Sequence, residues 1–214
     1  MNRYSALAFC ALASALCNGC AHVVSQVTSF HTLPLVGNGQ TFVVTSTDTN
    51  MAGSLEFATY AKMISDKLGR SGYSPCDCVA SNADLIVFVL YGIDNGRTVL
   101  RSAPVYGWTG GGQTYYSGVV GGYSYSGSSY SQPQFGVVGS QQYSQVQFTR
   151  FLQVSMADGA DMRTGKVTWK YEGRVTSTGI SGNVSQIVPV MIDALFQNFP
   201  GVSGKTRRVS LPLP

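Results

Sequence analysis

The feature that most limits how this chain can fold is a long stretch without a single charged side chain. Between Arg101 and Arg150 there is no Asp, Glu, Lys or Arg, and Gly, Ser, Gln and Tyr predominate. Such a composition offers few aliphatic groups to bury, and its glycines raise the entropic cost of ordering the chain. We therefore expect a flexible, uncharged insertion over about residues 103–144, which serves either as a passive linker or as a contact surface.

The tyrosines of the insertion favour the second alternative, a contact surface. A tyrosine supplies a large contact area at a low cost in conformational entropy, and neighbouring Ser and Gly residues adapt their hydrogen bonds to a partner. The densest part of the insertion therefore predicts the following partner contacts: Tyr115, Tyr116, Tyr123, Tyr125 and Tyr130.

The residues before the insertion predict strands and one helix. Apolar and β-branched content favours strands over residues 23–33 and 41–45. Ser54 can cap a helix whose apolar stripe ends near Leu68. The nearly continuous apolar run over residues 83–91 indicates a strand that is covered on both faces, and hence a central place in the sheet.

Two hairpins are expected. Asp94-Asn95-Gly96 favours a tight turn from the central strand to a return strand over residues 97–102. Alternation with period two over residues 145–156 and 167–175 predicts a second, antiparallel hairpin with one face on the core and the other in water. Trp169 lies in this pattern and is predicted to be a core residue.

The C-terminal part predicts a second helix and completes the fold class. The helix is expected over residues 185–199, where Pro189 is tolerated only in the first turn or so. The tail from Lys205 is expected to be extended. The fold class is therefore α+β: a mainly antiparallel sheet with two amphipathic helices packed on one face, interrupted by the long Gly/Tyr/Ser-rich insertion.

The N-terminus has the layout of a bacterial secretion signal. Arg3 precedes an uncharged, mainly apolar run, and Gly19 stands directly before Cys20. The run is too short for the roughly 20 apolar residues that a membrane-spanning helix needs. The arrangement resembles a lipoprotein signal, which predicts residues 1–19 as the signal and residues 20–214 as a single α+β domain that begins with an acylated Cys20.

Acylation of Cys20 would tether the domain to a membrane, because several acyl chains together bury enough methylenes for durable anchoring. Ala21 follows the cysteine where an Asp would favour the inner membrane, so we expect an outer-membrane anchor that faces the periplasm. The alternative is a plain secretory signal that is cut after Ala13-Ser14-Ala15 and leaves Cys17 and Cys20 in the mature protein as thiols or as a disulfide.

Cys76 and Cys78 form a Cys-Asp-Cys pair in the mature chain. An oxidising envelope favours a disulfide between them, although so short a ring is strained. The sharper alternative is a redox-active or metal-binding pair. A zinc site needs about four ligands, and His22 and His31 lie far back in the sequence, so we expect no metal site.

The sequence offers no recognisable catalytic chemistry. Four of the ten acidic residues fall in predicted turns, where Asp is favoured for backbone reasons, namely Asp48, Asp94, Asp158 and Asp161. Both histidines lie near the expected anchor, so no Ser-His-Asp site is expected. We therefore expect no enzymatic activity and no cofactor.

The charge of the chain does not indicate a nucleic-acid-binding protein. The net charge of +4 is small, and the basic residues form only one compact group, Lys205, Arg207 and Arg208. Such a group is typical of solvated surface, so we expect no nucleic acid as a partner.

Several short motifs lie outside the insertion, where each occurs once: Gln40-Thr41-Phe42, Ser54-Leu55-Glu56, Gly72-Tyr73, Ala83-Asp84-Leu85 and Leu195-Phe196-Gln197-Asn198-Phe199-Pro200-Gly201. With them the chain resembles a family of uncharacterised envelope lipoproteins of Gram-negative bacteria that carry a domain of unknown function. The resemblance implies an α+β domain without an agreed activity.

The function expected from these features is a non-catalytic, lipid-anchored interaction module of the periplasm or outer membrane. It would bind another envelope protein or a glycan, through an exposed sheet edge or through the tyrosine-rich insertion. The alternative is a structural or assembly lipoprotein that self-associates, and an envelope enzyme is the third class.

Overall fold

The computed structural model describes residues 22–77 and 82–213. The expected signal, Cys20 and Cys78 lie outside the described residues. The chain divides into two compact units. The sheet unit comprises Met1–Gly96 and Phe148–Pro214, and the second unit, which we call the ribbon, comprises Arg97–Gln147.

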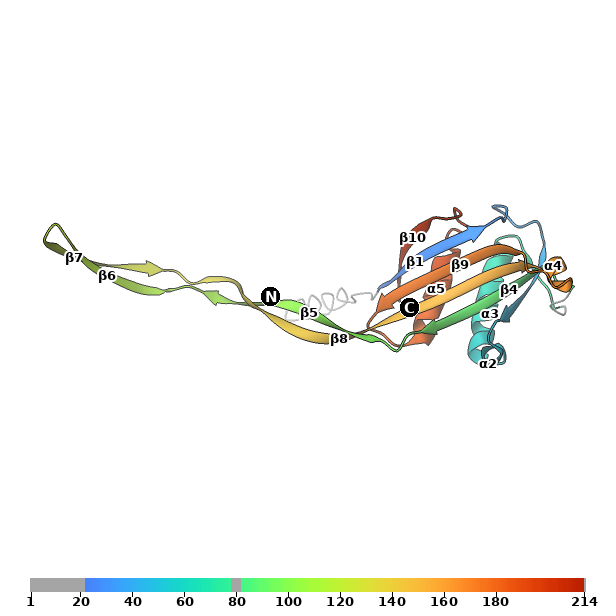
Figure 1. Cartoon of the computed structure of the whole chain (residues 1–214), viewed down its shortest axis with the longest axis horizontal. Helices are drawn as coiled ribbons and strands as arrows, with labels where there is room; N and C mark the ends of the chain where they lie inside the picture. The colour runs from blue at the N-terminus through green and yellow to red at the C-terminus, as the bar shows by residue number, and fades with distance from the viewer. Residues whose placement is uncertain (1–21, 78–81, 214) are drawn as a thin grey trace, which may run out of the picture. The chain divides into compact units, whose positions relative to one another are not determined.

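The sheet unit is a mixed α+β structure whose strands follow the order β10-β1-β9-β8-β4-β2-β3 (Figure 1). Pairing is antiparallel from β10 through β1, β9 and β8 to β4, whereas β2 pairs in parallel with both β4 and β3. The strands are β1 His22–His31, β2 Thr41–Ser46, β3 Ser74–Pro75, β4 Leu85–Ile93, β8 Gln134–Asp158, β9 Trp169–Gly179 and β10 Thr206–Pro212.

Helix α3, Leu55–Arg70, connects the parallel strands β2 and β4, since such strands cannot be joined by a tight turn. It begins as predicted after Ser54, whose hydroxyl accepts a hydrogen bond from the Phe57 N–H at 3.0 Å. Its buried stripe includes Ile64 and Leu68. A short helix α2, Thr49–Ala52, precedes it.

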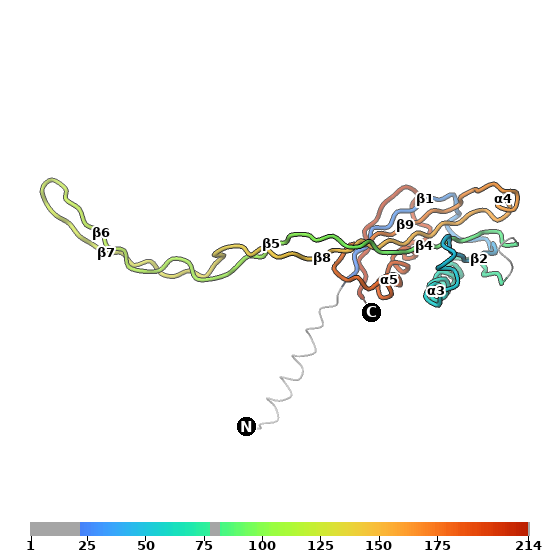
Figure 2. Tube along the Cα trace, turned by 60° about the horizontal axis from the view of Figure 1, so that its bottom comes forward, coloured from blue at the N-terminus to red at the C-terminus, as the bar shows by residue number. Residues whose placement is uncertain are grey.

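The core lies between one face of the sheet and the helices α3 and α5, Val184–Phe196 (Figure 2). Strands β4 and β8 contribute Val87, Val89, Leu152 and Val154 to this face, and all four are fully buried. Pro189 lies in the second turn of α5, later than the first-turn position expected for it. Strand β10 supplies Arg207, whose guanidinium donates to the carbonyls of Ala194 and Leu195 at the C-terminal end of α5.

The turn at Asp94–Gly96 does not close a hairpin between β4 and the return strand. β4 pairs with residues 150–158 of β8, and the next strand, β5 Arg97–Thr109, pairs with residues 134–147 of the same strand. The predicted hairpin of these two strands is therefore wrong. The local chemistry of the turn is as expected, because the Gly96 N–H donates to Asp94 Oδ1 at 3.0 Å and Gly96 has a φ of 74°.

The antiparallel pairing of β8 with β9 is confirmed, but Trp169 is not a core residue. A bulge makes Lys170 the extra residue of β9, since Ala157 pairs with Trp169 and Met156 pairs with Tyr171. One extra residue reverses the alternation of side chains between the two faces. Tyr171 is therefore buried, whereas Trp169 is 43% exposed and lies against Phe88 on the opposite face.

Residues 103–144, expected to form a flexible insertion, are instead paired in regular strands. β5 pairs with β8, and β6 Gly112–Val120 pairs with β7 Tyr123–Ser131, so that the ribbon is two strands wide (Figure 1). The two-residue turn Gly121-Gly122 has positive φ at both positions, 61° and 87°, as the favoured two-residue hairpin turn requires. Gly-Gly between two β-rich runs was the sequence signal for this hairpin.

Candidate interaction surface

The five tyrosines predicted as partner contacts all lie in β6 and β7, but on two different faces. Residues opposite each other in an antiparallel pair share a face, and successive residues alternate. Tyr116, Tyr123 and Tyr125 therefore lie on one face, and Tyr115 and Tyr130 lie on the other. The five tyrosines therefore belong to one pair of strands but do not form a single surface patch.

On the first face, tyrosine rings lie across glycines of the opposite strand. Gly127 is the cross-strand partner of Tyr116, and Gly118 is the partner of Tyr125. A Cβ added to either glycine would come within 2.7 Å of atoms of the facing tyrosine. The absence of a side chain thus lets each ring cover the backbone, which leaves Tyr116 and Tyr125 about half exposed while Tyr123 is 82% exposed.

The second face holds a short polar chain. The Tyr115 hydroxyl donates to Gln113 Oε1 at 2.9 Å, and the Gln113 amide donates to the Ser128 hydroxyl at 3.1 Å. These bonds join β6 to β7 on the side opposite the glycine-covering rings. The two faces therefore offer different chemistry to a partner, one mainly aromatic and the other hydrogen-bonding.

An aromatic cluster that the sequence analysis missed lies in the other part of the ribbon. Trp108 and Tyr106 of β5 both contact Phe135 of β8, with ring centroids 5.5 and 6.2 Å apart. All three side chains are at least 60% exposed. The spacing of two between Tyr106 and Trp108 places both rings on one face of a strand, and this alternation was the available signal. We call these three residues the Trp108 cluster.

The sheet unit offers a shallow depression on the face away from the helices. It has a volume of about 370 Å³ and is lined by residues of β1, β8 and β9, among them Phe30, Gln153, Glu172 and Arg174. Glu172 and Arg174 are two residues apart on one strand, so their side chains share this face and bring opposite charges to it.

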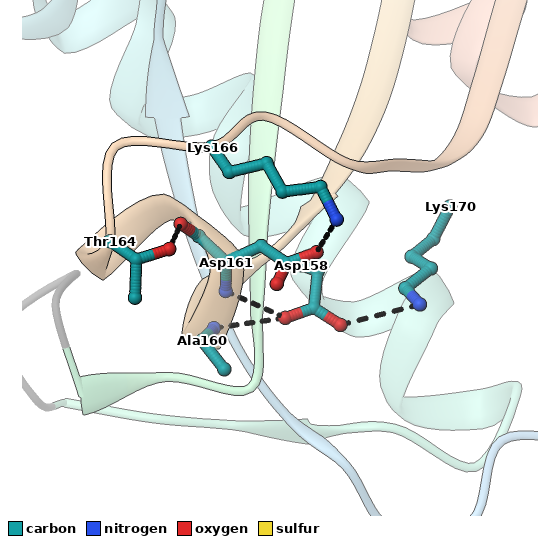
Figure 3. Close-up of polar contacts among 6 residues, drawn as sticks. All are labelled: Asp158, Ala160, Asp161, Thr164, Lys166 and Lys170. Atoms are coloured by element: carbon teal, nitrogen blue, oxygen red, sulfur yellow. Dashed lines mark hydrogen bonds and ion pairs between the residues drawn. The ribbon is translucent and has the colours of Figure 1, made fainter.

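Two acidic residues at one corner of the sheet unit, Asp158 and Asp161, bind backbone N–H groups or lysine side chains of the same corner. Asp158 caps the short helix α4, Gly159–Arg163, by accepting hydrogen bonds from the N–H groups of Ala160 and Asp161 at 3.0 and 3.1 Å (Figure 3). Its other oxygen lies 3.3 Å from Lys170 Nζ. The Asp161 N–H bond is the largest of several effects that hold the pKa of Asp158 below its usual value. Lys166 lies 3.6 Å from Asp161, so both carboxylates have partners.

The structure bears on one of the predicted cysteine sites. Cys76 is disulfide-bonded, and the other cysteines of the chain lie outside the described residues. The Cys76–Cys78 pairing and the acylation of Cys20 therefore stay predictions. Within the described ranges, no three His, Cys, Asp or Glu side chains come together to hold a metal ion. None of the helices described is both long enough and apolar enough to span a membrane.

Comparison with known proteins identifies a family and several distantly similar solved structures. The family model of a domain of unknown function, DUF4136, matches residues 26–201. No curated protein matches the chain. A crystal structure of a PDZ domain protein from Parabacteroides distasonis is similar with a TM-score of 0.45 and 14% identity, over 94% of this chain and 41% of that one. The chain thus spans less than half the length of that protein.

The second similar structure is a PelC dodecamer from Paraburkholderia phytofirmans. Its TM-score is 0.37 and its sequence identity to this chain is 11%. The similarity covers 81% of this chain and 95% of that one.

Proposed function

Because the chain belongs to the DUF4136 family, whose description names no activity, we propose a function from its own surface: it is a non-catalytic interaction module of the cell envelope. Its contact surface is the ribbon, which binds an envelope protein, either a second copy of this chain or a different protein, or a glycan. Acylation at Cys20 holds the module at the outer membrane on the periplasmic side.

The observation that carries this proposal is the exposure of large aromatic side chains on a ribbon whose only charged residues are Arg97 and Arg101. Trp108 is 70% exposed and Tyr123 is 82% exposed, and no charged residue lies between Arg101 and Arg150. Clusters of exposed apolar side chains mark interaction sites, and Trp and Tyr are the residues that most often dominate binding energy. The ribbon combines both properties at the Trp108 cluster and at the tyrosines of β6 and β7.

The acidic corner supports a non-catalytic reading of the sheet unit. A general acid or base must be available to exchange a proton with a bound substrate. Asp158 is instead occupied by two backbone N–H groups and by Lys170, and Asp161 faces Lys166. Both carboxylates are thus committed to closing the turn between β8 and β9.

Photo-crosslinking in living cells tests the contact surface. A photoreactive amino acid is placed at Trp108 or at Tyr123, with the 80% exposed Leu35 of the sheet unit as the matched control site. We expect adducts from the two ribbon sites, identified by mass spectrometry, and few from position 35. Equal adduct formation at all three positions, or none at Trp108 and Tyr123, would contradict the proposal.

Metabolic labelling tests the anchor separately. We expect labelled palmitate to enter the wild-type chain and not the Cys20→Ala variant, because Cys20 is the residue that resembles a lipid-attachment site. The Cys76→Ala variant is the control and should be labelled like the wild type. Equal labelling of the Cys20→Ala variant would refute acylation at this residue.

A further inference from the structure

We propose that the partner of the ribbon is a second copy of this chain, and that the two copies pair through the free edge of β8. Residues 140–146 of one copy would lie antiparallel to the same residues of the other about a two-fold axis. The product is a four-stranded sheet made of two ribbons. This inference rests on the proposed function, since it names the partner of the same contact surface.

The direction of the backbone groups of β8 follows from one pair of hydrogen bonds. The Asp94 N–H donates to the Thr149 carbonyl at 3.0 Å, and the Thr149 N–H donates to Asp94 Oδ1 at 2.9 Å. The backbone groups of Thr149 therefore point toward the side on which β4 and β5 pair. Successive residues of a strand point their N–H and C=O groups to opposite sides. The groups of Ser140, Gln142, Ser144 and Val146 consequently point to the other edge.

That edge is unpaired over the ribbon, whereas β9 pairs with β8 only from Phe148 onward. Residues 140–146 include no proline and no charge. Natural edge strands are protected from pairing by Lys, by Pro, by bulges or by a covering segment. In β8 the bulge lies at Val138, outside the proposed pairing segment.

The edge of β5 is less suited to the same pairing. Pro104 lies opposite Ser140, and by the same alternation its backbone nitrogen points outward, where a proline has no N–H to donate. Arg97 and Arg101 add positive charges to this strand. The two edges of the ribbon therefore differ, and β8 presents the uninterrupted row of donors and acceptors.

A second copy suits this edge for two reasons. Two identical uncharged edges can meet without like-charge repulsion, and a two-fold axis matches every donor with an acceptor. A two-stranded hairpin is also marginal in water, whereas a sheet with more strands and an apolar face is stable. Pairing through β8 would place the apolar residues Leu100 and Val146 of both copies on one face of the combined sheet.

A charge-exchange experiment tests the proposed edge on the full chain in detergent, by sedimentation equilibrium at matched density. We expect the wild type to associate as a dimer. Gln142→Lys with Ser144→Lys should raise the dissociation constant roughly tenfold, because like charges meet across the axis, and Gln142→Glu with Ser144→Glu should do the same. An equimolar mixture of the two variants should regain wild-type affinity.

The matched control is Thr98→Lys with Ser102→Lys. These residues are cross-strand partners of Val146 and Gln142, so they share the same face of the ribbon but belong to β5. The control should dimerise like the wild type. A monomeric wild type, equal weakening by the control, or a mixture that stays dissociated would overturn the inference.

The crosslinking experiment separates this inference from the proposed function. Adducts of the chain with itself at Tyr123 and Trp108 agree with both. Adducts with a different protein, together with a monomeric wild type, would leave the ribbon as a contact surface and refute the second copy as its partner.

Discussion

At the scale of single residues, Arg150 is the least expected member of the core. It is only 3% exposed and interrupts the apolar face of β8 beside the buried Leu152. Its guanidinium donates to the Ser181 carbonyl at 2.8 Å and to the Ser177 hydroxyl at 3.1 Å. Burial lowers the pKa of Arg150, and the charge of Asp94 opposes this effect. The side chain therefore ties β8 to β9 and to the segment that leads into α5.

Replacing this arginine should destabilise the sheet unit. Arg150→Ala removes two hydrogen bonds from a charged donor and leaves the Ser181 carbonyl without one of them, which costs about 2–3 kcal/mol of the free energy of unfolding. Urea denaturation measures the change. Arg174→Ala, at an exposed position of β9, is the control and should change the free energy by less than about 0.5 kcal/mol. Equal losses in the two variants would contradict the role of Arg150.

Asp84 should make the free energy of unfolding depend on pH. Its Oδ2 accepts hydrogen bonds from the Thr41 N–H and hydroxyl, both at 2.8 Å. The Thr41 backbone N–H is the main cause that lowers the pKa of Asp84 below 3.8. Since the folded pKa is below the unfolded one, the stabilisation is present above pH 3.8 and is lost as the pH falls through the folded value.

Unfolding free energies at pH 7 and pH 3 check this linkage. The Asp84→Asn variant should lose less stability between the two values than the wild type does, because the group can no longer bind a proton. Asp66→Asn, on the exposed side of α3, is the control and should follow the wild type. An unchanged acid dependence in Asp84→Asn would exclude the proposed linkage.

At the scale of elements, the sequence predicts those that depend on local chemistry. The Ser54 cap and the stripe through Leu68 correctly give α3, and the alternation of residues 145–156 and 167–175 correctly gives the pairing of β8 with β9. The ribbon was missed because its composition, rather than its alternation, guided the prediction. The sequence contains no direct signal that β4 and β5 both pair with β8, because this pairing depends on contacts between segments that are far apart in the sequence.

The candidate contact residues illustrate the same limit. Their chemistry led to the five tyrosines, and the structure places all of them in β6 and β7. Their division between two faces depends on register, which the turn Gly121-Gly122 sets. The Trp108 cluster depends on contact between β5 and β8, whose residues lie far apart in the sequence.

The glycine-covering rings give a prediction for the ribbon itself. Gly127→Ala should displace the Tyr116 ring, because the new Cβ would lie 2.7 Å from it, and the β6–β7 pair should loosen. Amide hydrogen exchange in β6 should become about tenfold faster, which corresponds to about 1.4 kcal/mol. Gly136→Ala is the matched control in β8, where an added Cβ meets nothing within 4 Å, and it should not accelerate exchange.

At the scale of the whole molecule, the buried core contains no residue of the ribbon. Replacing residues 98–146 by Asn-Gly would join the cross-strand partners Arg97 and Gln147 through a two-residue turn. The free energy of unfolding of the sheet unit should change by less than about 1 kcal/mol, as chemical denaturation would measure. A loss of cooperative unfolding in this variant would show that the sheet unit depends on the ribbon.

Strand β1 lies between β9 and β10 in the sheet, although both neighbours come from the last part of the chain. Residues 25–31 pair with residues 171–177, and residues 22–28 pair with residues 206–212. Because β1 is synthesised well before β9 and β10, both of its edges stay unpaired until these two neighbours have been made. Contacts of this sequence span slow folding, and a product that terminates before residue 169 keeps β1 with both edges unpaired, which favours aggregation.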